Sequence, residues 1–217
     1  MDGARDDASG GYPYEVDRPA VPLCVDLEGT VVRGDLLIDA AKLLIKRSGL
    51  NVFLILFWIS RGAAVLKAEL AEHILLNPEA LYYDRDVVRW LALERGAGRT
   101  LWLCSSMNER VAARVAEDLG FFEGVLASSR DVNLSGAAMA ERLVGKFGHR
   151  GFDYCANIGR DLLVWKHARS AIAVHGNSRL EQDAGRYAEI LRSIPKQARL
   201  RWATVSTWLH RYRWKPR

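Results

Sequence analysis

Acidic, hydroxyl and amide side chains end several apolar runs of this 217-residue chain. The run at 21–26 ends on Asp26, and Glu28 follows two residues later. A second run ends on Ser105, and a third ends on Asn157, four residues before Asp161. If these runs are parallel strands, their carboxyl ends bring the side chains to one site. The sequence therefore predicts a ligand site at which an acid, a hydroxyl, an amide and a second acid converge.

Strands and helices must alternate along the chain to position these residues. Alternating patterns predict an α/β fold with a parallel sheet of five or six strands, covered by helices on both faces. Three strongly apolar helical segments, punctuated by Gly49 and Gly62, fill residues 36–81 between the first strand and the next helix. We expect strands at 21–26, 100–105, 124–127, 152–157 and 171–175, and helices at 85–95, 108–119, 136–147 and 161–168.

The stretch VDLEGTVV at 25–32 resembles the first motif of the haloacid dehalogenase-like (HAD) superfamily, whose usual form is DxDGT. The later motifs of that family follow in order: a strand ending in a hydroxyl at Ser105, and the pair Asn157 and Asp161 in place of the acidic pair. The resemblance covers roughly residues 20–178. It implies a HAD-type Rossmannoid sheet with a small helical cap inserted after the first strand.

A narrower resemblance links the chain to the HAD domain that precedes UbiA-type membrane prenyltransferases. It rests on VDLEGTVVRGDLL, LFWISRGAAVLKAELA, NLSGAAMAERL and FDYCANIGRDLLVW, and it includes the cap pattern W-x-x-R-G-x-x-x-L-K from Trp58 to Lys67. Together with composition, it implies a flexible segment at 1–19, a HAD core at 20–35 and 84–178, a helical cap at 36–83 and a basic helical tail at 179–217.

The resemblance also implies a Mg²⁺-dependent hydrolase that acts on small phosphate monoesters through an aspartyl-phosphate. Asp26 would be the nucleophile, and Glu28 would be the general acid and base. The phosphate would contact Ser105 and Ser135. The implied metal ligands are Asp26, the Glu28 main-chain carbonyl, Asn157 and Asp161.

Two departures from the family pattern favour an alternative function. Glu28 replaces the usual aspartate and is one methylene longer. Ser135 stands where related domains carry a lysine, and Lys146 lies about 15 Å away along the same predicted helix at 1.5 Å per residue. The alternative is a catalytically impaired HAD module with a binding or regulatory role, linked to a membrane prenyltransferase or an isoprenoid pathway.

Several residues also have simpler structural explanations. Asp161 would also be favoured in the first turn of its helix by the helix dipole, and Ser105 would serve as the N-cap of the following helix, a role that Ser106 or Asn108 could also fill. The spacing Cys104-x5-Arg110 matches cysteine-dependent phosphatases, but the intervening SSMNE contains no glycine, so we expect a buried core cysteine. An ordinary polar role is expected for His175.

The aromatic residues of the apolar segment have two interpretations. Core packing is expected for Phe53, Phe57 and Trp58, and a hydrophobic lid over a lipid-like substrate is the alternative. The ten-residue run at 50–59 is shorter than the roughly 20 residues that a membrane-spanning helix needs.

The distribution of charge and the number of cysteines limit the expected binding partners and the expected cellular compartment. Residues 196–217 hold seven Lys or Arg and no acid, so the remaining chain is near neutral and nucleic-acid binding is not expected. The tail is predicted either to dock on the domain or to lie on an anionic membrane surface. Three widely spaced cysteines indicate buried thiols and a cytoplasmic protein, peripheral to the inner face of a membrane if the tail binds lipid.

Overall fold

A parallel sheet forms the centre of the computed structural model, which describes residues 21–75, 81–157, 161–175, 182, 185–186 and 188–194. Its six strands have the order β3-β2-β1-β4-β5-β6, so β1 lies inside the sheet between β2 and β4. The expected α/β parallel sheet is therefore confirmed. The strands are β1 (Leu23–Asp26), β2 (Leu101–Asn108), β3 (Gly124–Ser128), β4 (Asp153–Ala156), β5 (Ser170–Val174) and β6 (Glu189–Ile194).

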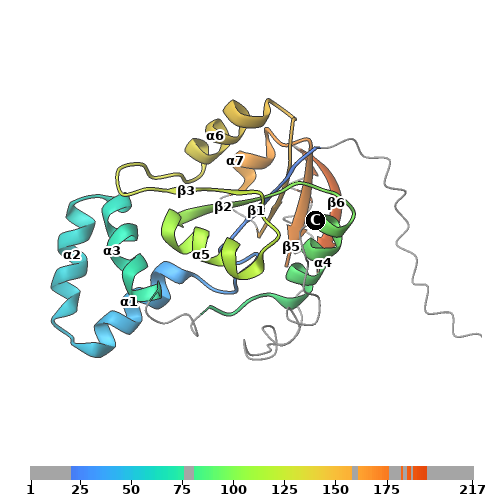
Figure 1. Ribbon diagram of the computed structural model, residues 1–217. Helices are drawn as coiled ribbons and strands as arrows, with labels where there is room; N and C mark the ends of the chain where they lie inside the picture. Colours follow the sequence, from blue (N-terminus) through green and yellow to red (C-terminus); the bar gives the residue numbers. More distant parts are fainter. Residues whose placement is uncertain are drawn as a thin grey trace, which may run out of the picture.

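Helices cover both faces of this sheet (Figure 1). Side chains of α4 and α5 belong to one buried cluster, and side chains of α6 and α7 belong to a second. Successive side chains of a strand point to opposite faces, and β1 follows that rule because Val25 lies in the first cluster and Cys24 in the second. The helices are α1 (Leu36–Arg47), α2 (Asn51–Ser60), α3 (Ala63–Leu75), α4 (Arg85–Gly96), α5 (Glu109–Leu119), α6 (Ala137–Phe147) and α7 (Leu162–Trp165).

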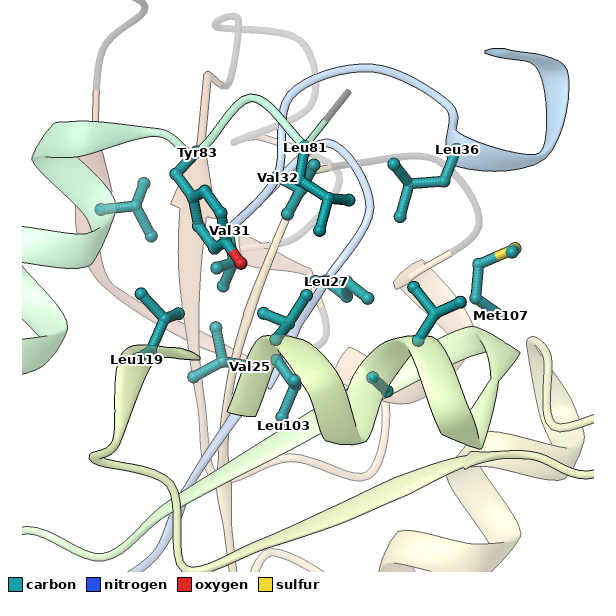
Figure 2. Packing of buried hydrophobic residues seen from close by; sticks show 14 of the residues in the cluster. Val25, Leu27, Val31, Val32, Leu36, Leu81, Tyr83, Leu103, Met107 and Leu119 are labelled. Carbon is teal, nitrogen blue, oxygen red and sulfur yellow. The ribbon is translucent and has the colours of Figure 1, made fainter. Parts of the chain in front are cut away.

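The first cluster anchors the segment that follows β1. Leu27 and Val31 pack with Leu103 of β2, and all three side chains are fully buried (Figure 2). Full burial of a leucine side chain contributes about 1.5–3 kcal/mol. This packing holds the backbone around residue 28 against the sheet, immediately beyond the carboxyl end of β1.

Helices α1–α3 are inserted between β1 and α4. The chain segment that leads into α1 and the segment that leads from α3 into α4 lie side by side. The Asp84 amide donates to the Val31 carbonyl at 2.8 Å, and the Arg33 amide donates to the Tyr82 carbonyl at 2.7 Å. The Arg33 guanidinium also contacts the buried Asp84 carboxylate at 2.8 Å. Three helices were expected here, and the break at Gly62 has a φ of 109°, which favours glycine.

Three elements differ from the sequence-based expectation. Strand β2 continues past Ser105 to Asn108 through a register shift against β3. Helix α7 is four residues long and ends before Ala168. Part of the segment 179–217, which we expected to be helical, forms the parallel edge strand β6 beside β5. The isoleucines at 190 and 194 suit a strand, and pairing with β5 satisfies the backbone groups of both strands.

The cap aromatics also differ from the expectation of core packing. Trp58 is buried, but Phe53 is 67% exposed and Phe57 is 57% exposed, so the expectation is wrong for both phenylalanines. A short helix resting on one neighbouring layer can bury only one stripe of its surface, and α2 is apolar on nearly every side.

The predicted flexible segment 1–19 and the basic residues 196–217 lie outside the described residues.

Candidate active site

A pocket beyond the carboxyl ends of β1 and β4 collects five of the six predicted site residues. It is lined by Asp26, Glu28, Ser135, Asn157 and Asp161, together with residues of β2, β4, α6, α7 and the segment before α6. Asp26 and Asp161 are 135 positions apart in the chain, and Ser135 lies between them. Parallel pairing of β1 with β4 brings the segments together, as expected for the carboxyl edge of an open α/β sheet.

The hydroxyl that reaches the pocket belongs to Ser106, while the predicted Ser105 points elsewhere. Ser105 is fully buried, and its Oγ accepts a hydrogen bond from the Met107 amide at 3.0 Å. Ser106 lines the pocket and donates to Glu28 Oε2 at 3.1 Å. Asp26 pairs with Cys104 in register, so strand alternation places residue 106 on the side of Asp26 and residue 105 on the opposite side. The alternation of side chains along a strand is the sequence signal that could have identified Ser106 as the residue on the side of Asp26.

Three carboxyl groups converge at this pocket. Burial raises the pKa of Asp26 well above its ordinary range, and the neighbouring charges of Asp161 and Glu28 raise it further. The Thr30 hydroxyl lies 3.4 Å from Asp26 Oδ2. Like charges held close together in a partly dry site favour protonation unless a cation compensates them.

A hydrogen bond joins the loops after β1 and β4. The Asn157 side-chain amide donates to the Gly29 carbonyl at 2.8 Å. Gly29 has a φ of 76°, and a Cβ atom there would lie 3.1 Å from Asn157 Nδ2. Glycine therefore permits both the turn and the close approach. Because the amide nitrogen of Asn157 is used, its oxygen is the atom that remains suited to a cation.

The donor set at the pocket contains only oxygen atoms. Across the described ranges, no group of three His, Cys, Asp or Glu side chains forms a ready metal cluster. The predicted metal ligands are not a group of that kind, because they combine two aspartates, Asp26 and Asp161, with an asparagine side chain and a main-chain carbonyl. Burial is the main cause of the raised pKa of Asp26, and the negative charges of Asp161 and Glu28 raise it further. Hard oxygen donors with excess negative charge fit Mg²⁺.

Asp161 precedes α7 but does not cap it. Its backbone is at the N-cap position of the helix, and its side chain makes no capping hydrogen bond. Its charge raises the pKa of Asp26 and also of the buried Tyr154. The carboxylate therefore acts on the pocket, in addition to any favourable interaction with the helix dipole.

Ser135 lies two residues before α6, at the position where the domains of the resembling family carry a lysine. It lines the pocket beside Gly136 and the buried Met139. Lys146, at the far end of α6, is engaged elsewhere because its Nζ lies 4.1 Å from the ring centroid of Trp102. This cation–π contact holds its charge away from the pocket.

A different lysine approaches Ser135 from the inserted helices. Lys67 of α3 is only 8% exposed, and its Nζ donates to Asn133 Oδ1 at 2.7 Å. Asn133 Nδ2 in turn donates to Ser135 Oγ at 3.2 Å. Sequence reasoning did not place Lys67 at the site, although the cap pattern that ends on it was visible. Helical periodicity alone does not show that α3 packs against the loop before α6.

The other candidate residues occupy structural positions. Cys104 is fully buried, and the hydrogen bond between its thiol and Cys24, together with burial, raises its pKa, so the cysteine-phosphatase alternative gains no support. Asn108 caps α5 by accepting from the Arg110 amide at 3.1 Å. His175 Nε2 lies 2.9 Å from Asp84 Oδ2, consistent with the ordinary polar role expected for it.

Comparison with curated proteins finds one distant relative. The chain is 27% identical over 161 residues to the uncharacterized protein y4nM of Sinorhizobium fredii. The match covers 74% of this chain and 31% of the relative, so the chain spans about a third of that protein. The chain matches no protein-family model.

Solved structures share the architecture at low sequence identity. A substrate-bound phosphoserine phosphatase superposes with a TM-score of 0.58 at 12% identity, covering 90% of this chain and 99% of that protein. A HAD family hydrolase from Salmonella enterica serovar Typhi gives 0.56 at 12% identity, covering 81% and 68%. A HAD-like hydrolase from Streptococcus pneumoniae gives 0.52 at 14% identity, covering 88% and 97%. The chain therefore has the Rossmannoid fold of haloacid dehalogenase-like hydrolases.

Proposed function

We propose that this protein is a phosphomonoester hydrolase that acts through an aspartyl-phosphate on Asp26. The observation that carries the proposal is the convergence of Asp26, Glu28, Asn157 and Asp161 on one pocket at the carboxyl ends of β1 and β4. The fold, shared with phosphoserine phosphatase, supports a hydrolase of this class. The same shared fold supports a role for helices α1–α3 as a cap over the site.

The first half of the reaction transfers the phosphoryl group to the protein. A carboxylate oxygen of Asp26 attacks phosphorus and the ester P–O bond breaks. Glu28 donates a proton to the departing alkoxide, so an alcohol leaves. The Ser106 hydroxyl, 3.1 Å from Glu28 Oε2, orients a side chain that is one methylene longer than the usual aspartate.

The second half releases inorganic phosphate. Glu28, now ionised, accepts a proton from water, and the resulting hydroxide attacks phosphorus while the bond to Asp26 breaks. Both carboxyl groups thereby return to their starting protonation states. Mg²⁺ held by Asp26, the Glu28 main-chain carbonyl, Asn157 and Asp161 would offset the repulsion between phosphate and carboxylate.

Lys67 supplies the positive charge that Ser135 does not. In this proposal, Asn133 holds the Lys67 ammonium at the edge of the site beside Ser135. A fixed cation in a dry site stabilises charge that develops on a transferring phosphoryl group. Ser135 and Ser106 complete the hydrogen-bonding surface for the phosphate, and Ser105 supports the strand end through its bond to the Met107 amide.

The second candidate function is a HAD module that binds without turnover. The observation that favours it is the serine at 135, because the pocket itself carries no lysine among the lining residues that the structure describes. Such a module would bind a phosphorylated ligand and regulate a membrane prenyltransferase or an isoprenoid pathway, as the narrower sequence resemblance implies.

The proposal includes a cytoplasmic location, at the inner face of a membrane. Three buried free thiols suit a reducing compartment such as the cytoplasm. Among the described residues, no helix is long and apolar enough to cross a membrane. The basic residues 196–217 are proposed to favour the inner face of an anionic membrane.

A phosphatase assay with a panel of phosphomonoesters and Mg²⁺ separates the two functions. We expect turnover that Asp26→Asn abolishes and that the matched control Asp39→Asn, on the surface of α1, leaves unchanged. With p-nitrophenyl phosphate, whose leaving group needs no proton from Glu28, Glu28→Gln should accumulate phosphorylated protein in rapid-quench labelling because water activation is lost. Equal rates for the intact chain and Asp26→Asn would reject Asp26 as nucleophile. Ligand binding with no turnover on any ester would favour the regulatory module.

A further inference from the structure

Helix α2 presents an unusually apolar outer surface. Its two deeply buried large side chains are Ile55 and Trp58, whereas Phe53 is 67% exposed. Leu50, which precedes the helix, is 74% exposed. Contiguous exposed apolar surface of this kind marks an interaction site in a folded protein. The α2 face consists of Leu50, Val52, Phe53, Leu54, Leu56, Phe57 and Ile59.

The α2 face lies on the side of the inserted helices that points away from the sheet. Helix α2 packs against α1 and α3. In Figure 1 it forms the outer edge of the molecule, with α3 between it and α5. A flat surface therefore approaches this face without contacting the core domain first.

The charged residues that flank α2 in the chain are all basic. No acid occurs from residue 40 to residue 68. Lys46 and Arg47 precede the helix, Arg61 follows it, and all three are exposed. An apolar face bordered by cations is complementary to a surface that is apolar inside and anionic at its rim. A face meant for a second copy of the same chain would bring these like charges together.

We propose that the α2 face docks the protein on a phospholipid bilayer that contains anionic lipid. The phenylalanine and leucine side chains enter the boundary between headgroups and acyl chains, and Lys46, Arg47 and Arg61 contact lipid phosphates. The helix lies in the interface and does not span it, since ten residues are too few. This docking is independent of phosphatase activity and of the basic residues 196–217.

A fluorescent probe at position 53 tests the docking at the face itself. The three native cysteines are buried, so a single added cysteine is labelled selectively. The full chain carrying Phe53→Cys, labelled with an environment-sensitive nitrobenzoxadiazole dye, should brighten on vesicles of phosphatidylcholine with phosphatidylglycerol. Leu93→Cys, on the half-exposed Leu93 of α4, is the matched control and should not change.

Co-sedimentation with the same vesicles measures the affinity. Phe53→Glu with Phe57→Glu should lower binding by about 10²-fold, because two large apolar side chains no longer enter the lipid. Leu93→Glu with Val132→Glu makes the same charge change at two exposed apolar positions and should bind like the intact chain. High salt should weaken the binding that remains.

Three results would overturn the proposal. One is an intact chain that stays in the supernatant with anionic vesicles at low salt. Another is sedimentation with an unchanged dye at position 53, which would mean that a different segment, such as residues 196–217, contacts the lipid. The third is a dimer in light scattering that persists with excess vesicles and is broken by Phe53→Glu with Phe57→Glu, which would assign the face to self-association.

Discussion

The ammonium group of Lys67 in α3 is hydrogen bonded to the Asn133 side chain in the loop before α6, at 2.7 Å. This contact joins the inserted helices to the loop that leads to Ser135, which lines the candidate active site. A lysine at this place is 8% exposed, so its charge is less screened by water than that of a surface lysine. In the proposed function, the inserted helices therefore contribute the charge of Lys67 to the site as well as covering it.

Lys67→Met should lower kcat by about 10²-fold with a smaller change in KM, because a fixed cation acts mainly on charge that develops in the transition state. Steady-state kinetics with a cleaved ester measures both constants. Lys42→Met, at an exposed lysine of α1, is the matched control and should have no effect. An unchanged kcat in Lys67→Met would remove Lys67 from the mechanism.

Ser135→Lys should rescue the Lys67→Met variant. The new ammonium would extend from the start of α6 into the pocket that Ser135 lines, and one cation there is sufficient. In the intact chain, the same substitution should change kcat less, since Lys67 already supplies a charge. The comparison is a double-mutant cycle on kcat/KM. Additive effects of the two substitutions would show that the two positions do not serve the same phosphoryl group.

Asp26→Asn should raise thermal stability in metal-free buffer at neutral pH. The raised pKa of folded Asp26 means that, above the unfolded value of about 4, the folded chain binds more protons than the unfolded chain. Stability therefore falls as pH rises from about 4 through the folded pKa of Asp26, and the variant lacks this loss. We expect melting curves of the two proteins to coincide near pH 4 and to separate above it.

Mg²⁺ should reverse this order at neutral pH. A ligand that binds only the folded state stabilises it, and a cation beside Asp26 also compensates the negative charges of Glu28 and Asp161. The melting temperature of the intact chain should rise with Mg²⁺ concentration, and that of Asp26→Asn should rise much less. Equal responses would mean that Mg²⁺ binds away from Asp26.

Asp153→Asn should destabilise the fold without changing kcat. Asp153 is fully buried at the start of β4, the end of the sheet opposite the candidate site, and it pairs with both Arg99 and Arg169. Removing one partner of a buried ion pair costs about 3–5 kcal/mol, and each kcal/mol lowers the melting temperature of a chain of this size by about 2–4 °C.

The matched control for Asp153 is an exposed ion pair. Glu123→Gln breaks the contact between Glu123 and Arg95 at 3.5 Å and should cost less than about 1 kcal/mol. Thermal unfolding of both variants, followed beside kcat, gives the comparison. A similar small effect for both would show that Asp153 is not an anchor of the sheet.

Local sequence patterns determined most of the element order. Apolar runs that end in Asp26 and Asn157 are read as strands because a buried parallel strand needs continuous apolar residues, and parallel strands align their carboxyl ends. The breaks at Gly49 and Gly62 separated three helices, since glycine interrupts a helical pattern. These signals depend on neighbours in the chain, so the sequence by itself determines them.

Tertiary structure decided which side chains reach the pocket. Ser106 faces it and Ser105 does not, because Cys104 is in register with Asp26 and side chains alternate along the strand from that residue. Lys67 reaches Asn133 across 66 positions in the chain, which only the packing of α3 establishes. Phe53 is exposed because α2 packs on one side only. Sequence periodicity reports how apolar an element is, whereas the position of its neighbours decides which of its faces is covered.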